Sequence, residues 1–173
     1  MNDFNLLITT SRGNEAQVCS EMWYLLGEAG DNAPTVDKTG ISGVVAARTS
    51  LPTSIAIDRL RTILSEQPSE FRYTLRVIPI QKVVTSNVSS IKEAARDVAT
   101  KINEGETFRI TVEKRHTSIS RKELVEAVAS VVKNKVNLTN PDKIIVIEVV
   151  GKHTGISVLS PPEILSIPKE RNY

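Results

Sequence analysis

Apolar and polar residues in the first half of the chain follow two different periods. Short runs that alternate, or that are continuously apolar, predict strands at Leu6–Thr9, Thr35–Lys38 and Val44–Arg48. Two longer runs have apolar residues three and four positions apart, which predicts a helix after the first strand and another after the third. The buried faces of these helices are expected to consist of Val18, Cys19, Met22, Leu25 and Leu26, and of Ala56, Leu60, Ile63 and Leu64.

A fourth strand is predicted at 71–77, where Phe71, Tyr73, Leu75 and Val77 alternate with polar residues. The basic side chains of Arg72 and Arg76 would then point outward. The order up to this point is strand, helix, strand, strand, helix, strand. This order is typical of a ferredoxin-like domain.

The second half of the chain begins with two predicted helices that have clear start signals. Ser90 with Glu93, and Ser120 with Glu123, have the spacing of a capping box at a helix N-terminus. Alternation over 108–112 predicts a strand between these helices. The pattern therefore switches from helix to strand and back within about 40 residues, a spacing typical of a compact α/β domain.

Three further segments complete the second half. The β-branched run 144–150 is nearly continuous, which predicts a strand covered on both faces. A short strand is expected at 155–159, and the prolines at 161, 162 and 168 predict an extended, loop-like tail. Together the elements predict an α/β (α+β) fold with two domains, a ferredoxin-like βαββαβ domain at 1–86 and a second α/β domain at 87–173.

Charge is distributed unevenly between the two halves. The chain has 173 residues and a net charge of +2, and its composition is that of an ordinary soluble protein. Residues 1–86 carry 8 Lys and Arg against 9 Asp and Glu, and residues 87–173 carry 14 against 11. An electrostatic footprint for nucleic acid is therefore expected in the second half. Aromatic residues make up only 4% of the chain, which disfavours recognition by base stacking.

The sequence offers few residues for catalysis, metals or cofactors. Cys19 is the only cysteine, and the two histidines, His116 and His153, lack partners at metal-binding spacing. The chain contains no nucleotide-binding glycine loop and no nucleophile elbow. We therefore expect no catalytic residue, no metal and no cofactor. Because no secretory leader or long apolar run is visible, we expect a cytoplasmic protein without a membrane partner.

The segment 114–122 concentrates positive charge between a strand end and a helix start. It holds four full cations, one histidine and three hydroxyl side chains within nine residues. Such a loop can place cations, hydroxyls and a helix N-terminus around phosphate oxygens. A solvated basic loop without a ligand explains the same pattern equally well. If the loop binds RNA, replacing Arg115 and Arg121 is expected to weaken binding with little effect on stability. Glu148 lies in a buried-looking run, and Arg109 is its expected partner.

A second candidate anion site lies at 11–14, between the first strand and the first helix. Asn14 or Ser11 would cap the helix, and Arg12 could add charge to a cradle of backbone N–H groups. A simple helix cap is the plainer interpretation, since every helix needs one.

The order and spacing of five segments resemble a THUMP domain. These segments are Thr107–Arg115, Ser120–Val125, Asn134–Asp142, Lys143–Val150 and Gly155–Val158. The resemblance covers about 87–160, and the preceding segment is similar to the ferredoxin-like domain that precedes THUMP in this family. The segment Asn134–Asp142 is most similar to stand-alone THUMP proteins that assist the tRNA N4-acetylcytidine acetyltransferase.

This resemblance implies a non-catalytic tRNA-binding adaptor. Such a protein grips the acceptor stem and 3′ end of tRNA and presents the tRNA to a separate modifying enzyme, here a tRNA cytidine N4-acetyltransferase. From the basic loop, the turn at 11–14 and the resemblance together, the expected RNA-binding residues are Arg12, Arg109, Lys114, Arg115, His116, Ser118, Arg121, Lys122, Asn134, Lys135 and Lys152.

Two other functions remain open at this point. Ferredoxin-like folds also host acyl-phosphate hydrolysis with an arginine in an anion-binding loop, and Arg12 would then be catalytic. Alternatively, the chain is a protein–protein assembly module without an RNA partner, and its basic loop is only solvated.

Overall fold

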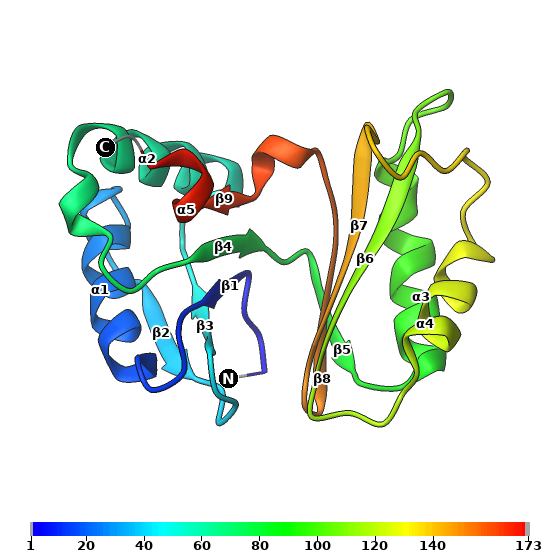
Figure 1. Cartoon of the computed structure of the whole chain (residues 1–173), viewed down its shortest axis with the longest axis horizontal. Helices are drawn as coiled ribbons and strands as arrows, with labels where there is room; N and C mark the ends of the chain where they lie inside the picture. Colours follow the sequence, from blue (N-terminus) through cyan, green and yellow to red (C-terminus); the bar gives the residue numbers. More distant parts are fainter. Residues whose placement is uncertain (1, 172–173) are drawn as a thin grey trace. The chain divides into compact units, whose positions relative to one another are not determined.

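Two β-sheets, each with helices packed on one face, organise the part of the chain that the computed structural model describes, residues 2–171 (Figure 1). The sheets belong to two compact units. The first unit comprises Asp3–Pro79 together with the C-terminal segment from Pro162, and the second comprises Ile80–Pro161. The expected α/β fold class is confirmed.

The first unit has the strand order β2-β3-β1-β4-β9, and every neighbouring pair is antiparallel. Its first six elements follow the expected order of strand, helix, strand, strand, helix, strand. They are β1 (Leu6–Thr9), α1 (Glu15–Glu28), β2 (Thr35–Lys38), β3 (Val44–Arg48), α2 (Thr53–Glu66) and β4 (Arg76–Pro79). Strands β4, β1, β3 and β2 therefore form the sheet of a ferredoxin-like domain.

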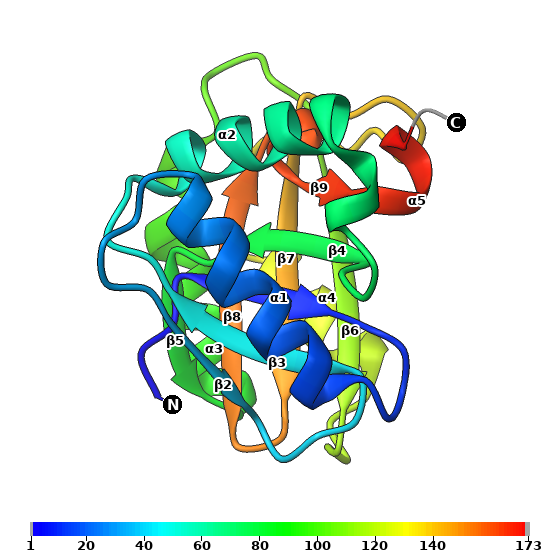
Figure 2. The same cartoon turned by 90° about the vertical axis from the view of Figure 1, so that its left-hand side faces the viewer.

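Helices α1 and α2 lie on the same face of this sheet (Figure 2). The buried residues of α1 are Val18, Met22, Leu25 and Leu26, and those of α2 are Ala56, Ile57, Leu60 and Leu64. Both sets pack into one core with Leu6 and Ile8 of β1 and with Val45 and Ala47 of β3. Cys19 is half-buried at the edge of this core, and burial is the largest cause that raises the pKa of its thiol.

The C-terminal segment returns to the first unit, contrary to the expected loop-like tail. After the 3-10 turn Pro161–Glu163, β9 (Leu165–Ser166) pairs with β4 and is followed by the short helix α5 (Ile167–Glu170). Leu165 and Ile167 are buried in the core of the first unit. Arg61 of α2 binds Glu170 with 2.6 Å between Nε and Oε1. Burial of these apolar side chains and this ion pair hold the tail against the first unit, although its prolines predicted an extended loop.

The segment 71–75 is not a strand, although its residues alternate in the sequence. It follows the 3-10 turn Pro68–Glu70 and bends before β4 begins. The carboxylate of Glu21 in α1 accepts hydrogen bonds from the backbone N–H groups of Arg72, Tyr73 and Thr74, and from the Thr74 hydroxyl. These N–H groups are therefore held by a side chain, and Leu75 is exposed rather than buried.

The second unit has the strand order β5-β8-β7-β6, in which only β6 and β7 are parallel. Its helices pack on one face around Phe108, Val112, Ile145 and Ile147. The elements are β5 (Lys82–Thr85), α3 (Val88–Val98), the 3-10 turn Ala99–Lys101, β6 (Phe108–Arg115), α4 (Arg121–Ala129), β7 (Lys143–Val150) and β8 (His153–Leu159). Every residue of β7 from Ile144 to Val150 is buried.

The two units do not divide at the expected residues 86 and 87. β5 directly follows β4 in the chain, but it pairs with β8 in the second sheet, so the division falls between Pro79 and Ile80. The second unit also ends earlier than expected, because the chain from Pro162 belongs to the first unit. At the start of α3, the Asn87 side chain accepts from the Ser90 N–H, so Asn87 caps the helix in place of Ser90.

Replacing Glu21 by alanine tests the bend at 71–75. Because Glu21→Ala leaves three backbone N–H groups without their acceptor, we expect the free energy of unfolding to fall by about 3 kcal/mol. Urea denaturation monitors the loss. Glu28→Ala is the matched control on the same helix, and its effect should stay within about 0.5 kcal/mol, as for other exposed positions. Equal effects of the two substitutions would show that the bend does not depend on Glu21.

Candidate nucleic-acid interface

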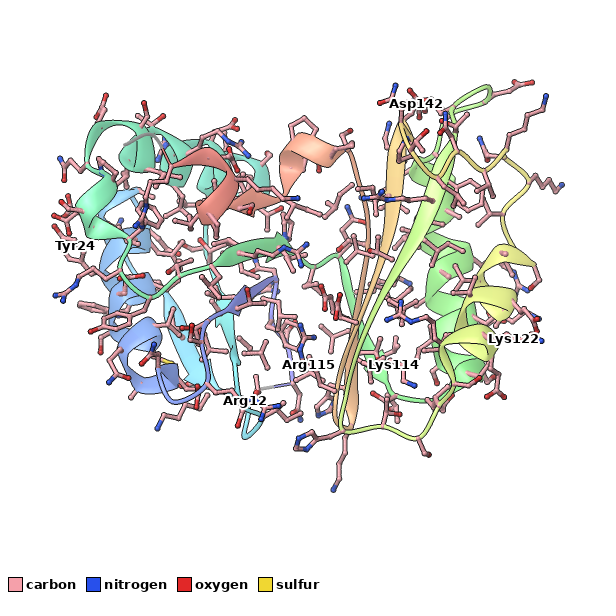
Figure 3. All side chains as sticks on the ribbon, in the orientation of Figure 1. Arg12, Tyr24, Lys114, Arg115, Lys122 and Asp142 are labelled. Carbon is pink, nitrogen blue, oxygen red and sulfur yellow. The ribbon has the colours of Figure 1, made fainter. Side chains whose placement is uncertain are left out.

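Alternation along β6 places its basic residues on opposite faces of the second sheet. Phe108 and Val112 point toward the helices and belong to the core, and Lys114 follows them on this face. Arg109 and Arg115 lie on the face away from α3 and α4. Figure 3 labels Lys114 and Arg115 on the two sides of the sheet. Adjacent cations at the end of β6 therefore do not point to one common ligand.

Arg115 forms an ion pair with Glu148 of β7. The distance from Nη1 to Oε2 is 2.9 Å, and the two side chains are only 18% and 2% exposed. The sequence suggested Arg109 as the partner of Glu148, whereas the ion pair joins Glu148 to Arg115 and the Arg109 guanidinium donates to the Leu138 carbonyl at 3.2 Å. A buried carboxylate needs a charged or hydrogen-bonding partner, and Arg115 supplies one. The expectation that Arg115 is an exposed cation, replaceable without loss of stability, is therefore wrong.

The other cations of the basic loop, which we define as Lys114–Lys122, are exposed. Lys114, Arg121 and Lys122 all have exposed side chains, and the Lys122 ammonium lies 4.0 Å from the Glu126 carboxylate one helical turn away. Ser120 caps α4, with its hydroxyl accepting from the Glu123 N–H at 3.0 Å, as the sequence predicts. The N–H groups of the first helical turn have no acceptors within the helix, so they favour an anion here.

The chain turns sharply where the basic loop leaves β6. His116 has a φ of 54°, in the left-handed region, and its side chain is exposed. The Gly151 N–H donates to the Arg115 carbonyl at 2.9 Å, which holds the turn between β7 and β8 against the end of β6. Lys152, which is also exposed, lies in this turn. Lys114, His116 and Lys152 therefore come from adjoining segments at one end of the sheet, while Ser118 is exposed further along the loop.

Asn134 and Lys135 lie at the other end of β6. The Lys135 carbonyl accepts from the N–H of Phe108, the first residue of β6. The eight residues of β6 separate this end from Lys114 by about 20 Å at the usual rise of a strand. The Asn134 amide donates to the carbonyls of Asn103 and Glu106 at 2.9 and 3.0 Å, so it braces neighbouring loops. The expected RNA-binding residues thus do not form a single cluster.

Two carboxylates, those of Asp142 and Glu106, connect the segments before β6 and before β7. Hydrogen bonds from the backbone N–H and hydroxyl of Thr107 lower the pKa of Asp142, which is labelled in Figure 3. A hydrogen bond from Lys143, 2.8 Å from the carboxylate, is the first cause that lowers the pKa of Glu106. Groups with lowered pKa values stabilise the fold at neutral pH and lose this effect as the pH falls through the folded-state pKa.

The turn at 11–14 in the first unit binds the carboxylate of the neighbouring residue Glu15. The Gly13 N–H donates to Oε2 of Glu15 at 2.8 Å, and the Gly43 N–H lies 3.4 Å from the same atom. Asn14 occupies the N-cap position of α1 without a side-chain hydrogen bond. Arg12 is exposed on this turn. Two of the N–H groups expected to cradle an external anion are thus already in use, that of Gly13 by Glu15 and that of Asn14 by the Ser11 carbonyl.

The exposed residues of the basic loop can bind phosphate groups. Lysine and arginine supply positive charge, and the start of α4 supplies backbone N–H donors. Among residues 2–171, no cluster of three or more His, Cys, Asp or Glu side chains could hold a metal ion. Within the same range, none of the helices has both the length and the apolar character needed to cross a membrane.

Substitution of Arg115 separates its structural role from that of its neighbour. Arg115→Ala leaves Glu148 without one of its partners in a buried setting, and we expect a loss of about 3 kcal/mol in the free energy of unfolding. Urea denaturation of Lys114→Ala, the exposed neighbour, should show a change within about 0.5 kcal/mol. If Arg115→Ala is as stable as Lys114→Ala, the ion pair does not support the sheet.

One segment of the second unit matches a known domain family. Residues 85–159 match the family model described as the THUMP domain. This range runs from the last residue of β5 to the last residue of β8 and includes the whole basic loop. No match is found among the curated proteins.

Solved structures show a similar fold over nearly the whole chain. PH1313 from Pyrococcus horikoshii is 15% identical, with a TM-score of 0.62 over 91% of this chain and 54% of its own. TrmN from Thermus thermophilus is 15% identical, with a TM-score of 0.55 over 88% of this chain and 44% of its own. A 4-thiouridine synthetase in complex with RNA is 12% identical, with a TM-score of 0.57 over 95% of this chain and 42% of its own.

The chain spans about half or less of the length of these three structures. At 12–15% identity the likeness is one of fold. The expected resemblance of about 87–160 to a THUMP domain is confirmed over 85–159 by the family match. The second unit, Ile80–Pro161, therefore contains a THUMP domain.

Proposed function

We propose that this chain binds tRNA through its THUMP domain and presents the tRNA to a separate modifying enzyme. The observation that carries this proposal is the exposed basic loop inside the THUMP match, between β6 and the capped start of α4. Lys114, Arg121 and Lys122 face solvent there, while Arg115 is occupied by Glu148. Phosphate contacts of this kind supply affinity without reading bases.

The fold comparison supports an RNA ligand. Of the structures similar to nearly the whole chain, one is a 4-thiouridine synthetase bound to RNA. A chain with this fold and few aromatic residues suits recognition of RNA by shape and backbone rather than by base stacking. We infer that the ligand is the acceptor stem and single-stranded 3′ end of tRNA.

We further propose that the chain itself is not an enzyme. Among the described residues the candidate cradle at Gly13 is occupied by the Glu15 carboxylate, and the basic loop offers cations and hydroxyls without an activated nucleophile. The separate enzyme would be a tRNA cytidine N4-acetyltransferase, because the segment 134–142 resembles stand-alone THUMP proteins that assist such an enzyme.

Binding of tRNA should depend on the exposed lysines of the basic loop. In Lys114→Ala/Lys122→Ala, two phosphate contacts are lost, so tRNA should bind more weakly. The slope of log affinity against log salt should become shallower by roughly 1 to 2 units. Filter binding with total tRNA at several salt concentrations measures both quantities.

The matched control replaces two exposed lysines of the first unit, Lys38→Ala/Lys169→Ala, which removes the same net charge. This control should keep at least most of the affinity and the original slope. Equal losses in the two double variants would indicate diffuse attraction and contradict a localised site. Unchanged binding in both would show that tRNA does not bind at the basic loop, and failure of the wild type to bind tRNA would leave an assembly module without RNA as the better explanation.

The chain alone should leave tRNA chemically unchanged. After incubation with acetyl-CoA, ATP and tRNA, mass spectrometry of the nucleosides should detect no modified cytidine. Addition of a tRNA cytidine N4-acetyltransferase from the same cells should produce N4-acetylcytidine, and the yield should rise with the amount of this chain. Modification by the chain without the enzyme would contradict an adaptor role, and an unchanged yield would exclude this enzyme as the partner.

A further inference from the structure

Helix α1 carries two large aromatic side chains on its solvent face. Trp23 is 59% exposed and Tyr24 is 44% exposed, whereas the other large apolar residues of the helix lie in the core. Figure 2 shows α1 on the outer side of its sheet, and Figure 3 labels Tyr24. Tryptophan is mostly buried in folded proteins, and Trp and Tyr are the residues most enriched at the energetic centres of protein interfaces. The core of the first unit does not explain their placement.

Gly27 lies on the same face, three and four positions after the aromatic residues. It is the second-to-last residue of the helix, its φ is not in the left-handed region, and an added Cβ would meet nothing within 4 Å. Glycine inside a helix lowers helix stability relative to alanine. Neither backbone geometry nor packing among the described residues requires glycine here. Close approach of another molecule to the backbone would account for it.

The charges around this face disfavour RNA. The charged residues of α1 are three glutamates, Glu15, Glu21 and Glu28. Glu28 and then Glu70 are the main causes that raise the pKa of the Tyr24 phenol, so both carboxylates lie near the ring. The cations Arg72 and Arg171 are engaged at 71–73, since Arg72 lies 5.7 Å above the Tyr73 ring and Arg171 donates to the Phe71 carbonyl. An acidic margin repels phosphates and suits a basic protein surface.

We propose that the α1 face, defined as Ser20, Trp23, Tyr24, Gly27 and Glu28, docks a separate protein that has an apolar centre and a basic margin. The aromatic side chains would fill the centre of the interface, the gap over Gly27 would admit a partner side chain, and Glu28 would meet a cation. The identification of this protein as the tRNA-modifying enzyme rests on the proposed function. The adaptor would then hold RNA by the cations of one unit and the enzyme by the acidic helix of the other.

A photocrosslinker at Tyr24 tests which molecule occupies the face. The full chain with p-benzoylphenylalanine in place of Tyr24 is expressed in its own cells, irradiated and purified, and its crosslinked partners are identified by mass spectrometry. We expect a tRNA-modifying enzyme as the partner. The same crosslinker at Ile55, which is exposed on α2 of the same unit, should not capture that enzyme. Crosslinks to a second copy of the chain, to tRNA, to an unrelated protein or to nothing would overturn the proposal.

Binding of the identified enzyme in purified form then tests the residues. Trp23→Ala should weaken binding at least about tenfold, as expected for a tryptophan at an interface centre. Gly27→Leu should weaken it similarly while the fold persists, because the added side chain enters open space. Glu28→Lys should also weaken binding, and Ile55→Ala should not. Wild-type affinity in both Trp23→Ala and Gly27→Leu would overturn the docking face.

The same variants separate this inference from the proposed function. Trp23→Ala and Gly27→Leu should bind tRNA as the wild type does, and Lys114→Ala/Lys122→Ala should bind the enzyme as the wild type does. If the chain does not bind tRNA but the enzyme still depends on Trp23, the docking face stands and tRNA binding fails. If tRNA binds and the enzyme ignores the α1 face, the docking face fails alone.

Discussion

The parallel pairing of β6 with β7 determines most of what the second unit presents to solvent. The register runs from Phe108 opposite Lys143 to Arg115 opposite Val150 without a break. β7 lies inside the sheet. The side chain of Glu148 on this strand is only 2% exposed. A charge in that position requires a partner, and the register places Arg115 within reach. The same alternation sends Lys114 to the other face. One pairing thus decides which of two adjacent cations supports the sheet and which remains available to a ligand.

Local patterns in the sequence were sufficient for elements whose own residues determine them. Strands β2 and β3 occur at the residues that the alternation predicts, β7 follows its β-branched run, and Ser120 caps α4. Elements that depend on distant residues were predicted wrongly. The alternation at 71–75 is overridden by a carboxylate from α1, about 50 positions earlier in the chain. The segment 161–168 contains three prolines, and nothing local indicates that Leu165 completes the core of the first unit.

The same distinction applies to the candidate site. Exposure of Lys114, Arg121 and Lys122 follows from a polar loop next to a capped helix, which the sequence makes visible. The role of Arg115 is not visible in the sequence, because Glu148 is 33 positions away and the pairing depends on the sheet register. The exposure of Trp23 was also hidden, since a tryptophan within an apolar helical stretch usually belongs to the core.

Similarity of fold at such low identity also has a physical basis. The apolar pattern that builds a sheet with helices on one face can be satisfied by many sequences, provided that volume and periodicity are kept. Loops and exposed faces are free of this constraint, so specificity can diverge there while the scaffold persists. For this chain, the residues that distinguish it from its structural relatives are therefore to be sought on the basic loop and on α1 rather than in either core.

The return of the C-terminal segment makes the THUMP-containing unit an insertion within the first unit. Strand β9 joins β4 only after the whole of Ile80–Pro161 has been synthesised. During synthesis on the ribosome, all residues of the inserted unit are therefore available before the sheet of the first unit can acquire its last strand, β9. The first sheet can consequently be completed only after the insert has been made, and a compact inserted unit shortens the effective loop between β4 and β9. A substitution that unfolds the inserted unit would thus also cost the first unit part of the stability that β9 supplies, although the substituted residue lies outside it.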